Sequence, residues 1–329
     1  MNGATNFKTR FHQWFHRLLT LGVLALTPGI APAAPNVVAS LAPVHSLAVG
    51  IMHGIGQPQL LVTGGASPHD YHLRPSDARV IAEADVLFWI GPDLERFLIR
   101  PLNNAKYNVQ AIALLDASGV TVFPLRTGGV WEAHRHAQAE EEHAGHDHAD
   151  HEAGHEADRD PHVWLDPLNA IAMTRRMVAV LSQVDPDHKT DYERNGATLI
   201  ERLNQLHQQL TARLAPIQNQ PYVVFHDAYQ YLERRYGLNA VGSVVLDPEQ
   251  RPGAKRVAEI QKHIRERGVR CVFSEPQFQP ALVNTVIAGS PARPGILDPL
   301  GAEIPPGTDA YFQLLEGLAD ALRACLSDV

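Results

Sequence analysis

The sequence predicts an α/β protein with two lobes, each built on a parallel β-sheet, and a long helix between them. Two observations carry this prediction. Short, continuously apolar segments alternate with amphipathic segments of helical period over residues 36–115, and the same alternation returns over residues 222–326. Such apolar strands are typical of parallel sheets that helices cover on both faces. The chain of 329 residues is also long enough for two domains of about 150 residues each.

Residues 1–33 are expected to be a signal peptide and not part of the fold. They contain no acidic residue and three basic ones, Lys8, Arg10 and Arg17. A short apolar core follows over residues 18–26, and Ala31-Pro32-Ala33 supplies the small residues of a cleavage site. A membrane anchor is disfavoured because this run is far shorter than the ~20 residues that a spanning helix needs. We therefore expect an exported, soluble protein.

The first lobe is predicted to span residues 35–165. Its strands are expected at the short apolar segments, residues 36–41, 59–62, 86–90 and 111–115. Its helices are expected where apolar residues recur with helical period, at residues 44–55 and 75–84 and from residue 93 onward.

Two long helices are predicted before the alternation returns. Residues 167–184 have more than one apolar face, and Asp185-Pro186 ends the helix. Residues 189–214 carry a leucine stripe of helical spacing, which is typical of core packing. The second lobe is predicted over residues 185–329, with strands at 222–225, 240–246, 269–273 and 295–297 and helices ending at 236 and spanning 253–267, 280–288 and 308–326.

Residues 132–160 have the composition of a disordered surface loop. They hold seven histidines and ten carboxylates, and no Val, Ile, Leu, Met or Phe that could be buried. Two arginines leave this segment with a net charge of −8, which equals the formal net charge of the whole chain. The acidity therefore belongs to the loop, which argues against a nucleic-acid partner and favours cations.

One pattern in this segment, His151-Glu152-Ala153-Gly154-His155, matches the HExxH signature of metalloproteases. That motif acts on a helix with a buried apolar side, whereas here its surroundings are Ala, Gly and acids. We interpret the segment as a set of weak, exchangeable zinc sites that feed a cleft, with a merely solvating insertion as the alternative.

Four residues are candidate metal ligands because each follows a predicted strand or ends the loop between the lobes. Ligands of open α/β sheets bind just beyond the carboxyl ends of the strands, and the candidates there are His69, His162, His226 and Asp298. Two would come from each lobe and would meet in the cleft between them. Three imidazoles and one oxygen suit Zn²⁺.

Alternatives remain open for several of these positions. Glu275 follows the strand predicted at 269–273 and rivals Asp298, which could instead be a turn residue before Pro299. Asp70 and Asp227 could accept hydrogen bonds from the neighbouring imidazoles, or could cap the helices that follow.

Cys271 and Cys325 are the two cysteines of the chain. In an exported protein an even pair is more often bridged than free. A bridge that closes so long a span would stabilise the fold by about 4 kcal/mol on the chain-entropy model. Two free, buried thiols are the alternative.

Several motifs resemble those of the zinc-binding periplasmic proteins of ABC importers, the ZnuA type. They are Gly65-Ala66-Ser67-Pro68-His69-Asp70-Tyr71, Pro161-His162-Val163-Trp164-Leu165-Asp166-Pro167, Phe225-His226-Asp227-Ala228-Tyr229, Phe273-Ser274-Glu275-Pro276-Gln277-Phe278 and Leu297-Asp298-Pro299-Leu300-Gly301. The resemblance covers the chain after the leader from end to end. The acidic, histidine-rich loop is typical of the zinc members, and some of them have a disulfide matching Cys271 and Cys325.

The resemblance implies two Rossmann-like lobes joined by a single rigid helix, placed here at residues 166–184. It implies His69, His162 and His226 as zinc ligands, because manganese-binding relatives carry Glu at the third position. Some zinc members have Glu before the first histidine, where this chain has Pro68. The fourth ligand is then Asp298, Glu275 or water, and we favour Asp298.

The function implied is capture of Zn²⁺ in the periplasm and its delivery to an ABC permease in the inner membrane. We expect a monomer that is not an enzyme and changes shape little on loading. Two alternatives remain: a zinc hydrolase that uses the same histidines with Glu275 as its base, and a periplasmic zinc chaperone or adhesin.

Overall fold

The first half of the chain folds around a parallel sheet of four short strands. The computed structural model describes residues 33–63, 65–104, 108–126, 131, 159–245, 248, 250–278 and 281–327. The strands are β1 (Val37–Ala39), β2 (Gln59–Leu60), β3 (Val86–Trp89) and β4 (Gln110–Ala113), in the order β2-β1-β3-β4. Helices α2 (Ala42–Ile51), α3 (Pro75–Ala82) and α4 (Arg96–Leu102) connect them. The predicted signal peptide and the HExxH pattern lie outside the described residues.

The second half repeats this arrangement. Its strands are β5 (Tyr222–Val224), β6 (Ala240–Ser243), β7 (Cys271–Ser274) and β8 (Arg293–Ile296), again parallel and in the order β6-β5-β7-β8. Its helices are α7 (Gln230–Tyr236), α8 (Ala254–Glu266), α9 (Ala281–Ile287) and α10 (Ala310–Leu326). The predicted α/β class with two parallel sheets is therefore confirmed.

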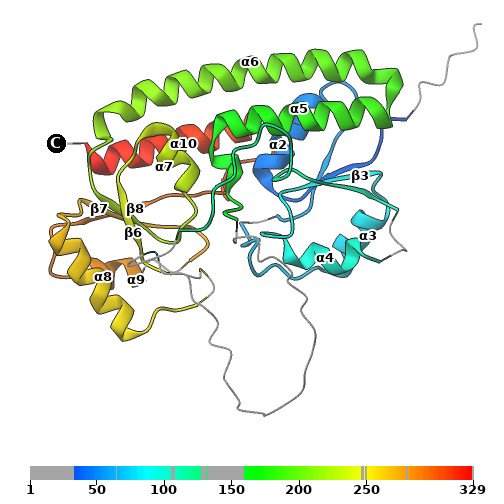
Figure 1. The fold of residues 1–329 in the computed structure, drawn as a ribbon. Coiled ribbons are helices and arrows are strands. Elements are labelled where there is room, and N and C mark those ends of the chain that lie inside the picture. The colour runs from blue at the N-terminus through cyan, green and yellow to red at the C-terminus, as the bar shows by residue number, and fades with distance from the viewer. Residues whose placement is uncertain are drawn as a thin grey trace, which may run out of the picture. The chain divides into compact units, whose positions relative to one another are not determined.

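Helices α5 (Pro167–Val184) and α6 (Lys189–Leu214) connect the two halves. The carboxylate of Asp166 caps α5 by accepting a hydrogen bond from the backbone N of Leu168 at 2.9 Å. Helix α6 packs against α2, α5, α7 and α10 and runs past both sheets (Figure 1). The expected single linking helix is consistent with the long helix α6, and its placement at residues 166–184, where α5 has the predicted ends, stays a prediction. The bounds of the domains remain a prediction.

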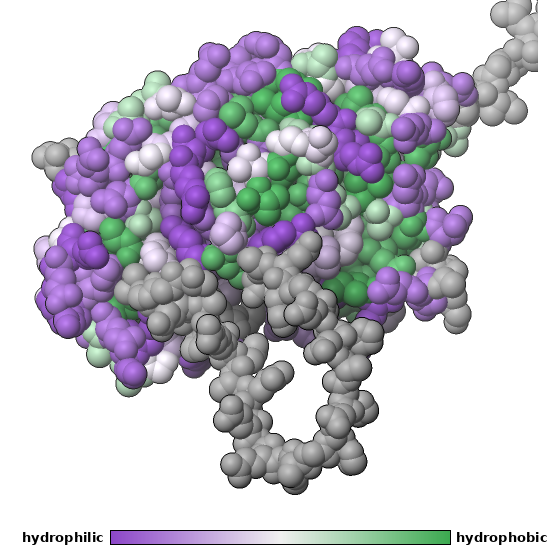
Figure 2. Space-filling model, in the orientation of Figure 1, coloured by the Kyte–Doolittle hydropathy of each residue, from purple (hydrophilic) through white to green (hydrophobic). Residues whose placement is uncertain are grey.

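The leucine stripe of α6 is buried, as its spacing predicts, and the residues on the opposite, outer side are mostly hydrophilic (Figure 2). One apolar core contains residues of both sheets together with this stripe, for example Phe88, Phe273 and Leu203. A smaller cluster covers the other face of each sheet, around Leu87 in the first half and Val272 in the second. The two halves thus share their main core.

A disulfide joins Cys271 at the start of β7 to Cys325 near the end of α10, with Cα atoms 6.2 Å apart. The predicted bridge is therefore confirmed. Within the described part of the chain, the helices are all too short or too polar to cross a membrane.

Candidate metal centre

Three imidazoles converge where strands of both sheets end. His69 lies in the loop after β2, His162 precedes the turn at Val163–Leu165, and His226 follows β5. One nitrogen from each ring lies within 4.8 Å of the others, the only such group among the described residues. The Nε2 atoms of His162 and His226 are 3.4 Å apart. Nitrogens bound at ~2.0–2.1 Å to a tetrahedral zinc ion lie about that far from each other.

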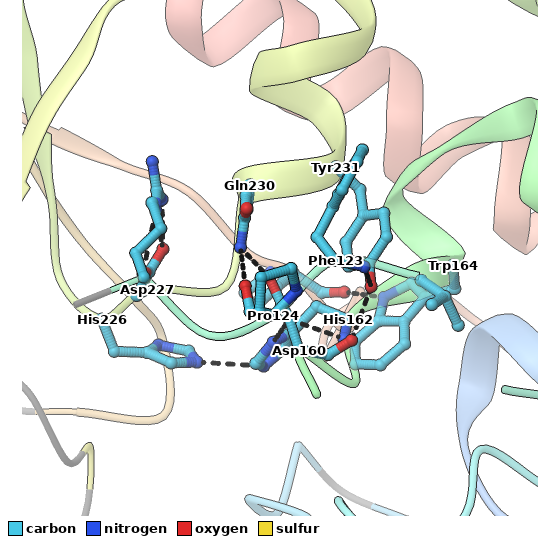
Figure 3. A network of polar contacts seen from close by, with 12 residues as sticks. Phe123, Pro124, Asp160, His162, Trp164, His226, Asp227, Gln230 and Tyr231 are labelled. Atoms are coloured by element: carbon cyan, nitrogen blue, oxygen red, sulfur yellow. Dashed lines mark hydrogen bonds and ion pairs between the residues drawn. The ribbon is translucent and has the colours of Figure 1, made fainter. Parts of the chain in front are cut away.

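A buried carboxylate fixes the orientation of His162. Asp160 Oδ1 lies 2.8 Å from Nδ1 of His162 and accepts a hydrogen bond of 3.0 Å from its backbone N (Figure 3). The ring therefore carries its proton on Nδ1 and directs Nε2 at the other imidazoles. Trp164 packs against the same ring and donates from Nε1 to the carbonyl of Pro299 at 2.8 Å.

A second carboxylate fixes His226 in the same way. Oε1 of Glu275, which follows β7, lies 2.7 Å from Nδ1 of His226. Strands β5 and β7 are neighbours, so the sheet brings the two residues together. The ring of His69 is different, because it makes no hydrogen bond within the described part of the chain, where its ring–ring contacts are with the other two imidazoles.

Burial and charge set the protonation of the three rings. Burial lowers the pKa of His162 and His69 well below the usual range, and the positive charge of the neighbouring imidazoles adds to this effect. Burial also acts to lower the pKa of His226, but the charge of Glu275 and its hydrogen bond outweigh it, so the net shift is upward. Two rings are therefore neutral and ready to bind a cation, and the third gives up a proton more reluctantly.

Asp298, predicted as the fourth ligand, is outside this group. Its Oδ1 accepts hydrogen bonds from the backbone N of Leu300 and Gly301, both at 3.0 Å, and its Oδ2 accepts one from Ala302 at 2.6 Å. The side chain of Gln277 also donates to it, at 3.2 Å. The carboxylate of Asp298 therefore closes the turn after β8, which was the alternative for this residue.

The two aspartates considered as hydrogen-bond acceptors for the imidazoles do not have that role. Both carboxylate oxygens of Asp227 accept from the guanidinium of Arg126, and Asp70 is exposed beside His72. Asp160 has the role instead. The composition predicts that Asp160 belongs to the disordered loop 132–160. For this residue the prediction is wrong, because Asp160 is 0% exposed. The sequence signal was its position two residues before His162, where a side chain reaches the local backbone.

The cavity at the cluster is narrow and largely apolar. Besides the histidines, the residues lining it are Ser67, Pro68, Trp164, Glu275, Gln277, Phe278, Pro299 and Leu300. An apolar wall excludes water and strengthens the attraction between a cation and its ligands.

Parallel α/β sheets with three converging imidazoles define a candidate binding protein for a divalent transition metal. A family model described as "Zinc-uptake complex component A periplasmic" matches residues 37–325. The chain belongs to this family, known as ZnuA, whose members are periplasmic components of zinc-uptake complexes.

Individual relatives agree with this assignment. The chain is 44% identical over 319 residues to the high-affinity zinc uptake system protein ZnuA of Brucella suis biovar 1, covering 91% of this chain and 93% of the relative. The corresponding protein of Yersinia pestis is 35% identical over 321 residues, covering 96% and 98%. A crystal structure of ZnuA superimposes with a TM-score of 0.72 at 24% identity, over 89% of this chain and 100% of that one.

Proposed function

We propose that this protein captures Zn²⁺ with His69, His162 and His226 and delivers it to an ABC permease. The observation that carries the proposal is the Nε2–Nε2 distance of 3.4 Å between His162 and His226, each held by a carboxylate at Nδ1. A site with this spacing needs little rearrangement to accept the ion.

The donor set favours zinc over other divalent ions. Three neutral nitrogens suit a borderline-soft ion that prefers four ligands, whereas Mg²⁺ and Ca²⁺ prefer oxygen ligands in larger number. The names of the relatives, which are zinc uptake proteins, support the same ion.

We assign the fourth position to water. The oxygens of Asp298 accept from backbone N–H groups, and Oε1 of Glu275 is bound to His226, so turning either carboxylate toward the ion would break those contacts. This replaces our prediction of Asp298 as a ligand. It also disfavours the zinc hydrolase, because Glu275 was its candidate base.

The family, whose members are components of zinc-uptake complexes, supports the proposed delivery. A signal peptide at residues 1–33 would place the protein in the periplasm, and the loaded form would dock on a permease of the inner membrane. We propose no catalytic role. The adhesin alternative has weaker support, since the laminin-binding adhesin of Streptococcus agalactiae shares only 23% identity, at a TM-score of 0.72, and likeness at that level concerns the fold.

Calorimetry on residues 34–329 tests the proposal. We expect one tight zinc site that survives deletion of residues 132–158 and is lost in His226→Ala. The deletion stops before Arg159 because that residue and Asp160 belong to the described structure around the site. His207→Ala is the matched control, since the imidazole of this histidine bonds to the hydroxyl of Tyr236 and lies outside the group of three. Equal zinc affinity in His226→Ala and the unaltered chain would overturn the proposal.

Transport is tested separately. Zinc-loaded protein should stimulate ATP hydrolysis by its permease reconstituted in liposomes, and the metal-free protein should not. Equal stimulation by both forms would contradict delivery while leaving zinc capture intact.

A further inference from the structure

Helix α7 of the second half reaches across to the carboxylate that orients His162. The amide nitrogen of Gln230, at the start of α7, donates to Asp160 Oδ2 at 3.0 Å and to the carbonyl of Pro124 at 3.1 Å (Figure 3). Asp160 in turn holds His162 through its other oxygen. Gln230 is 0% exposed, and its buried amide oxygen has no hydrogen-bond partner among the described residues. The amide is thus oriented by its two acceptors, one of which is Asp160.

The next residue of α7 fixes the backbone of Asp160. The hydroxyl of Tyr231 donates to the carbonyl of Asp160 at 2.6 Å and accepts from the backbone N of Phe123 at 3.1 Å (Figure 3). The ring of Tyr231 packs on the ring of Phe123, with centroids 5.0 Å apart. The guanidinium of Arg234 lies over the ring of Phe123, 4.2 Å from its centroid. Both the side chain and the main chain of Asp160 are therefore fixed from α7.

The same short segment also carries a ligand. His226 lies four residues before Gln230, and the guanidinium of Arg126 joins Asp227 to Glu233 of α7. The segment from 226 to 233 thus contains one of the imidazoles, that of His226, and it fixes a second, that of His162, through Asp160. His69 alone among the three rings has no hydrogen bond to a carboxylate in the described residues.

We propose that Gln230 and Tyr231 are positioning residues for zinc, and that they act through Asp160. They hold His162 and His226 as a rigid pair, with their nitrogens spaced as in a site that binds one zinc ion. The imidazole of His69 completes the site and is the first ligand to release the ion. This inference rests on the proposed function. Loss of the contacts from α7 would leave all three ligands present but free one of them to rotate, so zinc would be released faster while its rate of entry stayed the same.

Three variants and a control test the inference. Gln230→Met keeps the volume and removes the donor, Gln230→Glu replaces the donor with an acceptor beside Asp160, and Tyr231→Phe removes one hydroxyl. Gln261→Met is the control, because that half-buried amide of α8 donates to the carbonyl of Thr285 in α9, outside the metal site. Zinc release is followed by stopped flow into an excess of chelator. Ligand geometry is followed by the visible absorption of the Co²⁺-loaded protein.

We expect Gln230→Met to speed zinc release by about tenfold, the lower end of what loss of an outer partner costs a metal site. Gln230→Glu should release zinc at least as fast as Gln230→Met, and Tyr231→Phe should also speed release. The rate at which zinc enters the site should stay within about twofold of that of the unaltered chain. The Co²⁺ spectrum should shift in these variants and not in Gln261→Met. Thermal unfolding without metal identifies a variant that fails to fold. If the Gln230 variants fail to fold, the release rate and Co²⁺ spectrum of Tyr231→Phe decide whether the positioning role stands.

Unchanged release rates and Co²⁺ spectra in folded Gln230 and Tyr231 variants would overturn the positioning role. That result would leave the proposed function standing, provided that the unaltered chain binds zinc tightly. Absence of a tight site in the unaltered chain would instead refute the proposed function.

Discussion

Two buried carboxylates determine which nitrogen of each imidazole is available to an ion. Asp160 and Glu275 each lie within hydrogen-bonding distance of Nδ1, so the Nε2 atoms of His162 and His226 are left facing each other. Carboxylates in this position also make the imidazole a stronger electron-pair donor to a metal ion, because they stabilise positive charge on the ring.

Removing either carboxylate should weaken zinc binding. We expect Asp160→Ala and Glu275→Ala each to lower the affinity by about 10–100-fold, since the imidazole loses both its fixed tautomer and its orientation. Calorimetry on residues 34–329 measures this. Asp70→Ala is the control, because that exposed carboxylate lies next to His69 in sequence and bonds to none of the ligands. Equal losses in all three variants would point to general charge and not to orientation.

The protonation of His226 should govern the pH dependence. Its pKa is raised above 6.5, so on acidification this ring takes up a proton first, and zinc must displace that proton. The pKa values of His69 and His162 are lowered, so these rings stay neutral to lower pH. Affinity should be constant well above the pKa of His226, fall by about tenfold per pH unit below it, and fall more steeply in stronger acid.

Calorimetry between pH 8 and 5, in two buffers of different ionisation enthalpy, gives both the affinity and the protons released. Near the pKa of His226 we expect fewer than two protons to be released for each zinc ion bound. An affinity that stays flat between pH 7.5 and 5 would contradict a site built from three histidines.

The turn after β8 explains why we assign the fourth position to water and not to Asp298. Asp298 accepts backbone hydrogen bonds from Leu300, Gly301 and Ala302, and it therefore closes the chain on itself before α10. A carboxylate at a strand end has the same sequence pattern whether it binds an ion or the backbone.

Asp298→Ala should therefore affect stability more than binding. Loss of this half-buried acceptor should cost about 1–3 kcal/mol of unfolding free energy, measured by denaturant titration of the metal-free protein. Zinc affinity should change by less than about threefold, since the fourth ligand is assigned to water. A loss of 100-fold or more in affinity would return Asp298 to the ligand set.

Helices were predicted better than strands and contacts. The ends of α5 match the sequence, because Asp166-Pro167 and Asp185-Pro186 mark them locally, and α6 has the predicted bounds of 189 and 214. Strand β6 ends at Ser243 although the apolar run continues to Leu246, since apolar character does not show where a neighbouring strand stops pairing. The three histidines could be predicted because strand ends in α/β folds place them together. The contact from Gln230 to Asp160 could not, because it joins residues from different halves.

The shared core bears on how the whole molecule responds to zinc. Both sheets contribute to one apolar cluster, and α6 packs against elements of both halves. Opening a hinge would expose that core to water, at a cost that metal binding would have to offset.

Loading should therefore leave the dimensions of the protein almost unchanged. We expect X-ray scattering of residues 34–329 to give the same radius of gyration with and without one equivalent of zinc, within experimental error. A clear decrease on loading would indicate closure of two separate domains and contradict a shared core.

Anomalous diffraction at the zinc edge, from crystals of residues 34–329 loaded with one equivalent of zinc, tests the central claim most directly. We predict one strong peak at ~2.0–2.1 Å from the Nε2 atoms of His162 and His226 and from a ring nitrogen of His69. A main peak elsewhere, or one that lacks any of these three nitrogens, would contradict the account.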